Sequence, residues 1–427
     1  MSRFLGVKSN YISIVSDKKF SSDILQIIEL PKELEHLSSE ELIVNCKVIN
    51  GKIKYKNVKK DLKDIKIALV SNYKMMCGIS TYAENLYPEI VKHIPNFKLF
   101  IEENAYPTGD ISVGDTKLPS DKFSICWKRG EPLTKLVEEI KSYDPDIILI
   151  QHEWGLFPNA GHWLAFMTQL SDFKVFVTMH SVYPNHKDKI ICEAAIPNII
   201  VHLEGAKFNL KQEKNISSNV DIIGHGCYPL DKEKIFNNYK SNHTILQMGF
   251  GFQYKNFEAT IEAASLLKNK YDDLFLTLLF SESPYNKAGH QLYYNSLVDM
   301  INNYNLQNHV AIIRNFQSDV VIKSFLKTNK VAVFPYMSNP EHEVFGASGA
   351  ARLAMANNMP VITSSINHFS DLPTIKANNA ADIAKEIDKL FSDYKLVDAQ
   401  LKKQSTFIEA NMWDNVAKNY IKVFCNN

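Results

Sequence analysis

An acidic pair followed by a run of small residues has the residue types and spacing best suited to chemistry. Glu341 and Glu343 precede a stretch of small residues that reaches Ala356, and a β-rich run at residues 360–362 follows. Small residues at the start of a helix let backbone N–H groups approach a ligand, and the unpaired N–H groups and the helix dipole favour phosphate. A carboxylate just before such a helix suits the hydroxyl groups of a sugar. The segment therefore predicts a pocket for a sugar attached to a diphosphate, with four residues at the phosphate: Phe345, Gly346, Ala347 and Ser348.

Histidines follow two of the expected buried strands. His152 comes after residues 146–150 and His180 after residues 175–178, so both lie at strand carboxyl ends, where ligands bind in α/β folds. A single histidine is more often structural, and that alternative stays open for each. Near residue 78 a strand, a loop ending in Gly78 and a helix form an element that can approach phosphate, although a glycine needed only for the turn is the alternative.

Arginine is rare in this chain, which makes its positions informative. The arginines are Arg3, Arg129, Arg314 and Arg352, and lysine supplies the remaining positive charge. The rigid fork of arginine suits phosphate better than the point charge of lysine. Arg314 and Arg352 fall in the part of the chain expected to hold the phosphate, so we expect them near it. Chance placement on a solvated face is the alternative.

Three regions of the chain must position these residues. Residues 1–63 contain two β-rich runs on either side of Asn50-Gly51, a strong hairpin signal, and predict a small β-containing appendage. An acceptor-binding or partner-binding module is the alternative for this region. Residues 64–235 and 236–404 each alternate strands with helices, which indicates two parallel, doubly wound α/β domains that face a cleft. Residues 405–427 have helical apolar spacing.

The expected strands can be stated by number. In the first α/β domain they are residues 65–70, 146–150, 175–178, 198–201 and 220–223. In the second they are residues 244–247, 274–280, 310–313, 331–334 and 360–363.

Composition is typical of a cytoplasmic protein. With 427 residues, of which 45% are hydrophobic and 22% charged, the chain can bury two cores. A net charge of +1 gives no broad reason to expect nucleic acid or an acidic membrane as partner. The six cysteines lack paired spacing, so neither a disulfide framework nor a metal site is indicated. Residues 1–12 lack the pattern of a signal peptide, and no apolar run reaches the roughly 20 residues needed to span a bilayer.

Taken together, these segments resemble the retaining glycosyltransferases of family 4, which have the GT-B fold of two Rossmann-like domains. The resemblance rests on Glu-x-Phe-Gly at residues 343–346, a small helix with Ala-Met-Ala at residues 354–356, and Pro-Val-Ile at residues 360–362. It implies a metal-independent enzyme without a cofactor, whose donor is a UDP- or GDP-linked sugar. The closing helix, which begins near Trp413, is similar to one that crosses back onto the N-terminal domain in the family. Two segments, 71–78 and 345–355, are also similar to glycosyltransferases of large tailed phages, for which the host cytoplasm would be the location.

The resemblance implies roles for residues in the second domain. Gly249 and Lys255 match a loop that holds the diphosphate in the family, and Lys255 would stabilise charge on the departing phosphates. Glu343 would hold hydroxyl groups of the sugar, with Glu341 beside it. We therefore expect Glu343 and Lys255 to act in catalysis.

In the first domain the resemblance implies contacts from four more residues. Gly78 and Ile79 match a glycine loop that abuts the donor, and His152 matches a histidine beside the transferred sugar. His180 matches a Thr-x-His element near the donor. We expect His152 to act in catalysis and the other three to bind the donor.

The chain also departs from the family at three places. Phe250 stands where the family has an arginine, Cys77 where it has its first glycine, and Ala351 or Leu353 where it has a second glutamate that binds ribose. Recognition of the ribose must therefore differ, and Arg314 or Arg352 would have to replace the missing arginine.

We predict a retaining glycosyltransferase that moves a hexosyl or pentosyl group from a nucleoside diphosphate sugar to a glycan, a lipid or another hydroxyl. One alternative is a phage glycosyltransferase that acts on modified DNA bases. An alternative of another class is a non-catalytic protein that binds sugar nucleotides, which the missing arginine and glutamate would fit. A phosphorylase or epimerase on the same scaffold is less favoured because those families carry other motifs.

Overall fold

The computed structural model divides the chain into two compact units, Met1–Ile65 and Lys66–Asn427. It describes residues 3–8, 11–15, 26–29, 46–49, 52–55, 61–103, 110–184, 188, 196, 198–231, 243–282, 287–338 and 344–426. The boundary expected near residue 235 lies outside the described residues.

The first unit is built of short antiparallel strands. β1 (Arg3–Lys8), β2 (Tyr11–Val15) and β3 (Gln26–Glu29) form one sheet in that order. β4 (Cys46–Ile49) pairs with β5 (Lys52–Tyr55) in the register of a two-residue hairpin. The predicted hairpin and the β-containing appendage are therefore confirmed.

The second unit opens with a seven-stranded parallel sheet, which carries the site residues of the first α/β domain. In spatial order the strands are β10 (Phe123–Trp127), β7 (Asn96–Glu102), β6 (Lys66–Ser71), β11 (Ile147–His152), β12 (Val175–Met179), β14 (Asn198–Val201) and β15 (Asn219–Ile222). The helices between them are α2 (Gly78–Val91), α3 (Thr134–Tyr143), α4 (Ala160–Gln169) and α6 (Glu204–Phe208). All five expected strands are present, and β7 and β10 are additional. Two small pieces, β8 (Ser112–Val113) and β9 (Thr116–Lys117), form an antiparallel pair.

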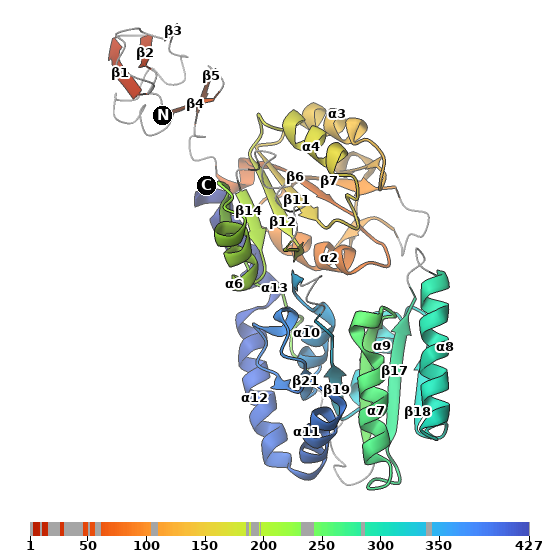
Figure 1. Cartoon of the computed structure of the whole chain (residues 1–427). Helices are drawn as coiled ribbons and strands as arrows, with labels where there is room; N and C mark the ends of the chain where they lie inside the picture. The colour runs from red at the N-terminus through yellow and green to blue at the C-terminus, as the bar shows by residue number, and fades with distance from the viewer. Residues whose placement is uncertain are drawn as a thin grey trace. The chain divides into compact units, whose positions relative to one another are not determined.

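Alternation along the strands divides the side chains between two faces of this sheet. Ile148 and Ile150 of β11 belong to a core cluster that also holds residues of α3, α4 and α6. On the other side, α2 packs against α13 (Trp413–Asn426), and the ring of Phe424 lies 4.8 Å from that of Phe176. Helices therefore cover both faces, as parallel strands require (Figure 1).

A six-stranded parallel sheet follows. In spatial order its strands are β18 (Val310–Ile313), β17 (Phe275–Ser281), β16 (Thr244–Phe250), β19 (Val331–Phe334), β21 (Val361–Thr363) and β22 (Ile375–Lys376). Its helices are α7 (Phe257–Leu267), α8 (Lys287–Asn303), α9 (Asp319–Thr328), α10 (Gly349–Ala356), α11 (Ala380–Ser392) and α12 (Tyr394–Ala410). The five expected strands are again present, and β22 is additional. Two parallel sheets with crossover helices confirm the predicted α/β class.

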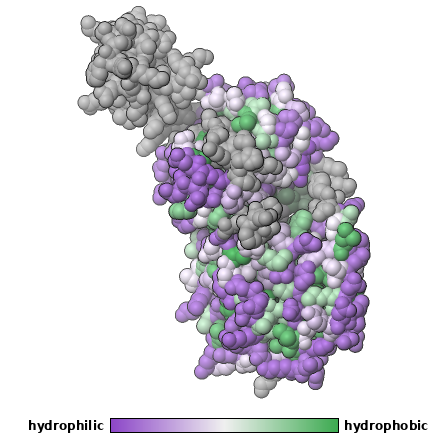
Figure 2. Space-filling view, viewed as in Figure 1, coloured by the Kyte–Doolittle hydropathy of each residue, from purple (hydrophilic) through white to green (hydrophobic). Residues whose placement is uncertain are grey.

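Helix α8 shows how the local pattern builds this layer. Its buried residues are His290, Tyr293, Leu297 and Ile301, which recur at helical spacing on one face. The opposite face is exposed, and hydrophilic side chains gather along this edge of the domain (Figure 2).

The last helix returns to the first sheet. The hydroxyl of Tyr420 in α13 lies 3.0 Å from that of Tyr82 and 2.9 Å from that of Thr178, and Lys174 donates to the carbonyl oxygen of Phe424 at 2.7 Å. Residue 405, where we expected the closing segment to begin, lies inside α12, so the returning helix itself begins at Trp413. Among the described helices, none has the length and apolar character needed to cross a membrane.

Candidate active site

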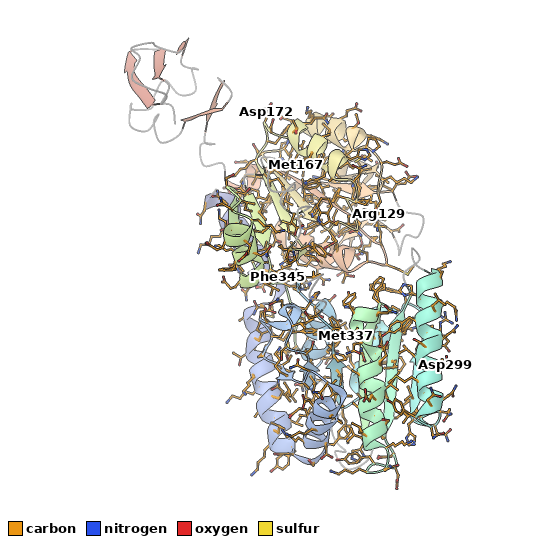
Figure 3. The ribbon with its side chains drawn as sticks, in the orientation of Figure 1. Arg129, Met167, Asp172, Asp299, Met337 and Phe345 are labelled. Atoms are coloured by element: carbon orange, nitrogen blue, oxygen red, sulfur yellow. The ribbon has the colours of Figure 1, made fainter. Side chains whose placement is uncertain are left out.

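A short antiparallel ladder joins the two parts of the second unit. β13 (Ser181–Val182), directly after His180, pairs with β20 (Phe345–Gly346), directly before α10. Phe345 lies where the two α/β domains meet (Figure 3). The ladder brings the segment that we expected to bind phosphate against the strand end that carries His180.

Glycines make room at this ladder. A Cβ atom at Gly346 would lie 3.2 Å from the carbonyl oxygen of His180 and 3.5 Å from Nε2 of His368. A Cβ atom at Gly205 would lie 2.8 Å from the ring of Phe345, closer than packed atoms tolerate. Glycine at position 205 therefore allows Phe345 to pack on α6.

Helix α10 begins immediately after the ladder. Ser348 is its N-cap, and its side chain accepts a hydrogen bond from the N–H of Ala351 at 3.3 Å. Helix geometry leaves the first N–H groups without partners inside the helix, and the helix dipole favours an anion at this end. Ala347 and Ser348 thus lie at a helix start that suits phosphate.

Arg352 lies inside α10 and is only 1% exposed. Its guanidinium forms an ion pair with Asp371 and donates to the carbonyl oxygen of Ser348 at 3.1 Å. These partners make Arg352 a link between α10 and the loop that carries Asp371. Its contact with a diphosphate stays a prediction.

Lys255 lies on aromatic rings in the loop after β16. Its Nζ is 3.7 Å from the centre of the Tyr336 ring and 4.7 Å from that of Tyr254. A Cβ atom at Gly249 would lie 3.8 Å from the Lys255 stem, so the two predicted residues are neighbours. Burial lowers the pKa of Lys255, and no carboxylate among the described residues raises it. Cation–π contacts hold the ammonium on these aromatic faces, and its contact with a diphosphate stays a prediction.

His368 and Tyr336 connect Lys255 with the start of α10. Burial and, secondly, the charge of Lys255 lower the pKa of His368 to about 4. The ring of Tyr336 lies 6.1 Å from that of His368, and its hydroxyl lies close to the side chain of Ser348. Because Nε2 of His368 is also beside Gly346, these side chains surround one place at the start of α10.

Three histidines and Tyr82 form a second cluster, at the strand ends of the first sheet. Nδ1 of His180 lies 3.3 Å from Nε2 of His202, and Nδ1 of His202 donates to the carbonyl oxygen of Ile223 at 2.9 Å. The ring of Tyr82 lies 4.6 Å, 5.2 Å and 5.0 Å from those of His180, His202 and His225. Burial lowers the pKa of His202 to about 4 and the pKa values of His180 and His225 well below the usual range. The cluster is therefore neutral near physiological pH.

Hydrogen-bond chemistry fixes the tautomers in this cluster. A carbonyl oxygen can only accept, so His202 carries its proton on Nδ1 and its Nε2 accepts from Nδ1–H of His180. Nε2 of His180 must then accept in turn, but the atom placed 2.8 Å away is Oε1 of Gln151, which can only accept. The amide must therefore direct its NH₂ group toward His180, which also gives that nitrogen the partner it otherwise lacks among the described residues.

His152 ends β11, as expected, but aromatic rings enclose it. Its ring stacks on Phe157 at 5.5 Å and meets Trp163 at 4.5 Å and Trp154 at 5.3 Å. It is 1% exposed, and burial lowers its pKa to about 3, so the imidazole is neutral. Neither ring nitrogen has a hydrogen-bond partner among the described residues. Its carbonyl oxygen accepts from the N–H of His180 at 3.1 Å, so the two histidines are neighbours.

Helix α2 places its first turn near the histidine cluster. The helix begins at Gly78 with Cys77 as N-cap, and Ile79 packs partly against the core of the first sheet. A Cβ atom at Gly78 would meet no atom within 4 Å. Packing therefore gives no reason for a glycine at this position, whereas close approach by a ligand would.

Arg314 makes its contacts with residues other than Lys255 and those of α10. Its Nε donates to Glu282 at 2.6 Å and its Nη2 to Gln291 at 2.8 Å, and the guanidinium covers the ring of Tyr294 at 4.1 Å. These contacts connect the end of β18 to α8. A contact with the donor stays a prediction. Glu341 and Glu343, the expected ligands of the sugar, lie outside the described residues.

Sequence reasoning missed four residues of this site: His202, His225, Tyr336 and His368. His202 directly follows the strand at residues 198–201 and repeats the strand–histidine pattern of His152 and His180, so the signal for it was present. His225 lies between Gly224 and Gly226, a pattern that is typical of a turn and does not mark a functional residue. No local pattern marks the other two.

Comparison with known proteins agrees with this architecture. Residues 231–410 match the family model described as Glycosyl transferases group 1. No curated protein sequence matches the chain.

Solved structures match over most of the chain. A glycosyltransferase from Rickettsia africae has a TM-score of 0.63 at 16% identity, covering 84% of this chain and 98% of its own. An Anabaena protein, HepE in complex with UDP, has a TM-score of 0.65 at 10% identity, covering 85% and 100%. A structure described as trehalose-6-phosphate from E. coli bound with UDP-2-fluoro glucose has a TM-score of 0.64 at 11% identity, covering 85% and 99%. At these identities the likeness shows the fold, which is GT-B.

Proposed function

With a group 1 glycosyl transferase domain at residues 231–410, this chain is a glycosyltransferase, and on that premise we propose its donor and the residues that act. The donor is a UDP- or GDP-linked sugar, and transfer proceeds with retention and without a metal or cofactor. Support for a diphosphate donor comes from the cation at Lys255 and the start of α10, which surround one place. The structurally similar Anabaena protein in complex with UDP and glucose agrees with that proposal.

The chemistry asks for stabilisation of a departing anion. The bond between the anomeric carbon and a phosphate oxygen breaks, the acceptor hydroxyl forms the new C–O bond, and its proton leaves with the diphosphate. Charge grows on the diphosphate in the transition state, where preorganised donors lower the barrier most. Lys255 and the first N–H groups of α10 are such donors.

Lys255 carries the proposal. Its ammonium is held 3.7 Å from the Tyr336 ring, and its charge has no carboxylate partner among the described residues. A phosphate beside this ammonium would also raise its lowered pKa, because an opposite charge favours the protonated form. Donor binding and protonation of Lys255 therefore favour each other.

His152 is assigned to the transferred sugar. Because the pKa of His152 is about 3, the imidazole acts as a neutral hydrogen-bonding group and not as an acid. Its two unpaired ring nitrogens can serve a sugar hydroxyl as one donor and one acceptor. Glu343 remains the proposed partner for other hydroxyls.

The test is release of nucleotide from a panel of UDP-, GDP-, ADP- and CMP-sugars by the full-length protein. We expect nucleotide release from one UDP- or GDP-sugar. The rate of release should rise when the correct acceptor, a saccharide, a lipid or DNA, is added. Glu343→Gln tests the assigned glutamate, and Glu409→Gln, which changes an exposed glutamate of α12, serves as a matched control. Thermal stabilisation by a nucleotide sugar without turnover under any acceptor would support the binding protein instead. The proposal would be refuted if no donor of the panel bound to the protein and none released its nucleotide.

A further inference from the structure

His225 lies beside the start of α10, and the mechanism proposed above does not use it. It follows β15, the last strand of the first sheet along the chain. A Cβ atom at Gly349, the first residue of α10, would lie 3.6 Å from both Nε2 and Cε1 of its ring. His225, Gly349 and Ala350 are all half-buried. A ligand that reaches the first turn of α10 therefore also reaches this edge of the ring.

The hydrogen bond of His225 fixes its tautomer. Nδ1 lies 2.8 Å from the carbonyl oxygen of Gly226, which can only accept, so Nδ1 carries the proton. Nε2 of the neutral ring therefore presents a lone pair, and it makes no hydrogen bond with the described residues. This lone pair would repel a phosphate at the first N–H groups of α10 unless Nε2 is protonated.

The surroundings of His225 keep the ring neutral in the free protein. The neighbouring rings, with centres 5.0 Å, 5.6 Å and 5.5 Å from its own, belong to Tyr82 in α2, His202 after β14 and Trp413 in α13. Burial and, secondly, the positive charge of Arg352 in α10 lower the pKa of His225 well below its usual range. His202 and His180 act in the same direction.

A bound diphosphate would reverse this balance. The charge of Arg352 is already offset by its ion pair with Asp371, whereas a diphosphate brings two negative charges. An opposite charge close to an imidazole favours the protonated form. Protonation turns Nε2 of His225 into a donor, and Nδ1–H keeps its carbonyl partner. Both nitrogens of the imidazolium would then be paired.

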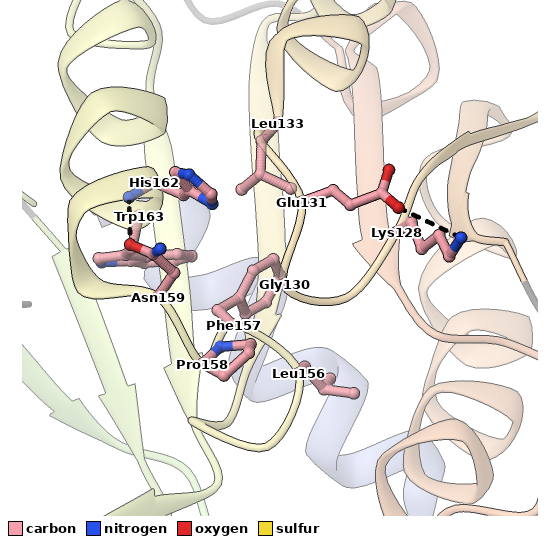
Figure 4. Close-up of a pocket in the computed structure, with 10 residues that line it drawn as sticks. All are labelled: Lys128, Gly130, Glu131, Leu133, Leu156, Phe157, Pro158, Asn159, His162 and Trp163. Carbon is pink, nitrogen blue, oxygen red and sulfur yellow. Dashed lines mark hydrogen bonds and ion pairs between the residues drawn. The ribbon is translucent and has the colours of Figure 1, made fainter.

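A pocket in the first α/β domain does not offer a competing place for a diphosphate. It lies between the loop after β10 and the first turn of α4 and has room for about one water molecule (Figure 4). Lys128, which lines it, is paired with Glu131 at 3.2 Å. The lining therefore provides neither the room nor an unpaired lysine for a nucleotide sugar.

We propose that Nε2 of His225 binds the diphosphate of the sugar nucleotide and takes up one proton when it does so. The imidazolium would add a second cation to that of Lys255, beside the first N–H groups of α10. Donor binding would then be stronger at lower pH, because the bound state holds one proton more than the free protein. The assignment rests on the donor proposed above and adds a residue to that site.

The first experiment measures the binding of UDP-glucose and of GDP-mannose to the full-length protein by calorimetry. Both phosphates of these probes are esterified, so the diphosphate itself does not titrate between about pH 5.5 and about pH 8. Titrations in two buffers with different heats of ionisation give the number of protons taken up. For the probe that binds, we expect an uptake that approaches about one proton. Its affinity should fall by up to about tenfold for each pH unit between the pKa of the free and that of the bound state.

Two variants address His225 in different ways. His225→Gln keeps a polar group but cannot take up the proton, so its affinity should depend much less on pH and should be weaker than that of wild type at about pH 5.5. Gly349→Ala is the second variant, because His225 packs among rings and its replacement can disturb folding. The added methyl group would touch Nε2 and Cε1 of His225 and should reduce the proton uptake in the same way.

Controls separate His225 from other histidines and from Lys255. Nδ1 of His309 also donates to a carbonyl oxygen, that of Leu274 at 2.8 Å, but His309 precedes β18 and so lies at the amino end of this strand. His309→Gln should therefore match wild type in affinity and proton uptake. Donor binding also favours protonation of Lys255, and Lys255→Met measures that share.

The outcomes distinguish this assignment from the donor itself. Proton uptake that persists in Lys255→Met but is reduced in His225→Gln and Gly349→Ala supports the assignment. A probe that binds without proton uptake, or with the same uptake in both His225→Gln and Gly349→Ala as in wild type, overturns the role of His225 and leaves the proposed donor standing. If neither probe binds to wild type, the proposed donor is refuted and the role of His225 with it.

Discussion

Replacing Lys255 by methionine should remove most of the turnover while leaving the fold intact. Methionine preserves the unbranched stem on the rings of Tyr336 and Tyr254 but removes the ammonium that lies 3.7 Å and 4.7 Å from their centres. Burial lowers the pKa of Lys255, which means that the folded protein disfavours its charged form. Below its folded pKa, Lys255 is charged in both states, and burial of this charge costs stability. The stability rises with pH between the folded pKa and the higher unfolded pKa. A neutral methionine removes the cost at every pH below this window. The unfolding midpoint of Lys255→Met should be equal to or above that of wild type.

The expected loss in catalysis follows from charge and distance. A phosphate oxygen that carries a unit charge about 4 Å from the ammonium would gain about 4 kcal/mol at an effective dielectric constant of about 20. The loss of one preorganised group in other enzymes reduces turnover by about 10²- to 10³-fold, which is of the same size. We therefore expect kcat/KM to fall by about 10²- to 10³-fold, with most of the change in kcat.

The assay is nucleotide release under steady-state conditions, together with urea unfolding of each variant. Lys376→Met is the matched control, because Lys376 also lies in the second domain but its ammonium donates to Thr363, Thr374 and the carbonyl oxygen of Phe369. That control should lose stability more than turnover. A Lys255→Met enzyme whose kcat/KM stays within about tenfold of wild type, about 1.4 kcal/mol, would refute the reasoning.

Three further predictions concern the rest of the site. Gly78→Ala should leave the melting temperature unchanged, because its Cβ would meet no atom within 4 Å, but it should weaken UDP or GDP binding measured by calorimetry. An unchanged affinity would mean that no ligand approaches Gly78. Arg352→Met should lower the free energy of unfolding in urea by about 3 kcal/mol, because it leaves Asp371 without its buried partner. A variant of unchanged stability that binds the donor more weakly would show instead that Arg352 binds the donor. His202 has a folded pKa of about 4 against an ordinary value of 6.5, so stability falls as the pH drops from 6.5 toward 4, and His202→Gln should flatten that part of a urea-unfolding series; an identical acid limb would contradict this.

The central strands of the two sheets could be predicted from the sequence because they are buried on both faces. The β-rich run of β11 is buried throughout, and an uninterrupted apolar stretch of this kind is typical of the centre of a parallel sheet. β7 and β10 were not predicted because polar residues interrupt them: Lys98 lies within β7 and Ser124 within β10. In addition, Ile125 of the edge strand β10 is 48% exposed. An edge strand needs only one buried face, so its pattern is weaker.

The candidate site was predictable to the extent that it follows from strand ends. His180 was predictable because parallel strands place their carboxyl ends on one edge of a sheet. The ladder of β13 and β20, which brings His180 against the segment before Ser348, joins the two α/β domains and does not follow from either sheet alone. Tyr336 and His368 could not be found in this way, since only the packing of loops places them beside Lys255.

The partner of Arg352 illustrates the same limit. Asp371 lies 19 residues further along the chain, beyond β21, and no periodic pattern links the two positions. The residue type predicted phosphate binding, whereas in the folded chain Arg352 is buried and pairs with Asp371.

The return of α13 to the first sheet has a consequence for how the chain is made. Residues Tyr82 and Phe176 leave the ribosome early, but the side chains that cover them, Tyr420 and Phe424, belong to the last helix. Because synthesis runs from the N-terminus, the first α/β domain must wait with this apolar face uncovered until the whole second domain has been translated. Premature termination within α13 would therefore damage the domain that was synthesised first, and a chimera that exchanges first domains must exchange α13 with them.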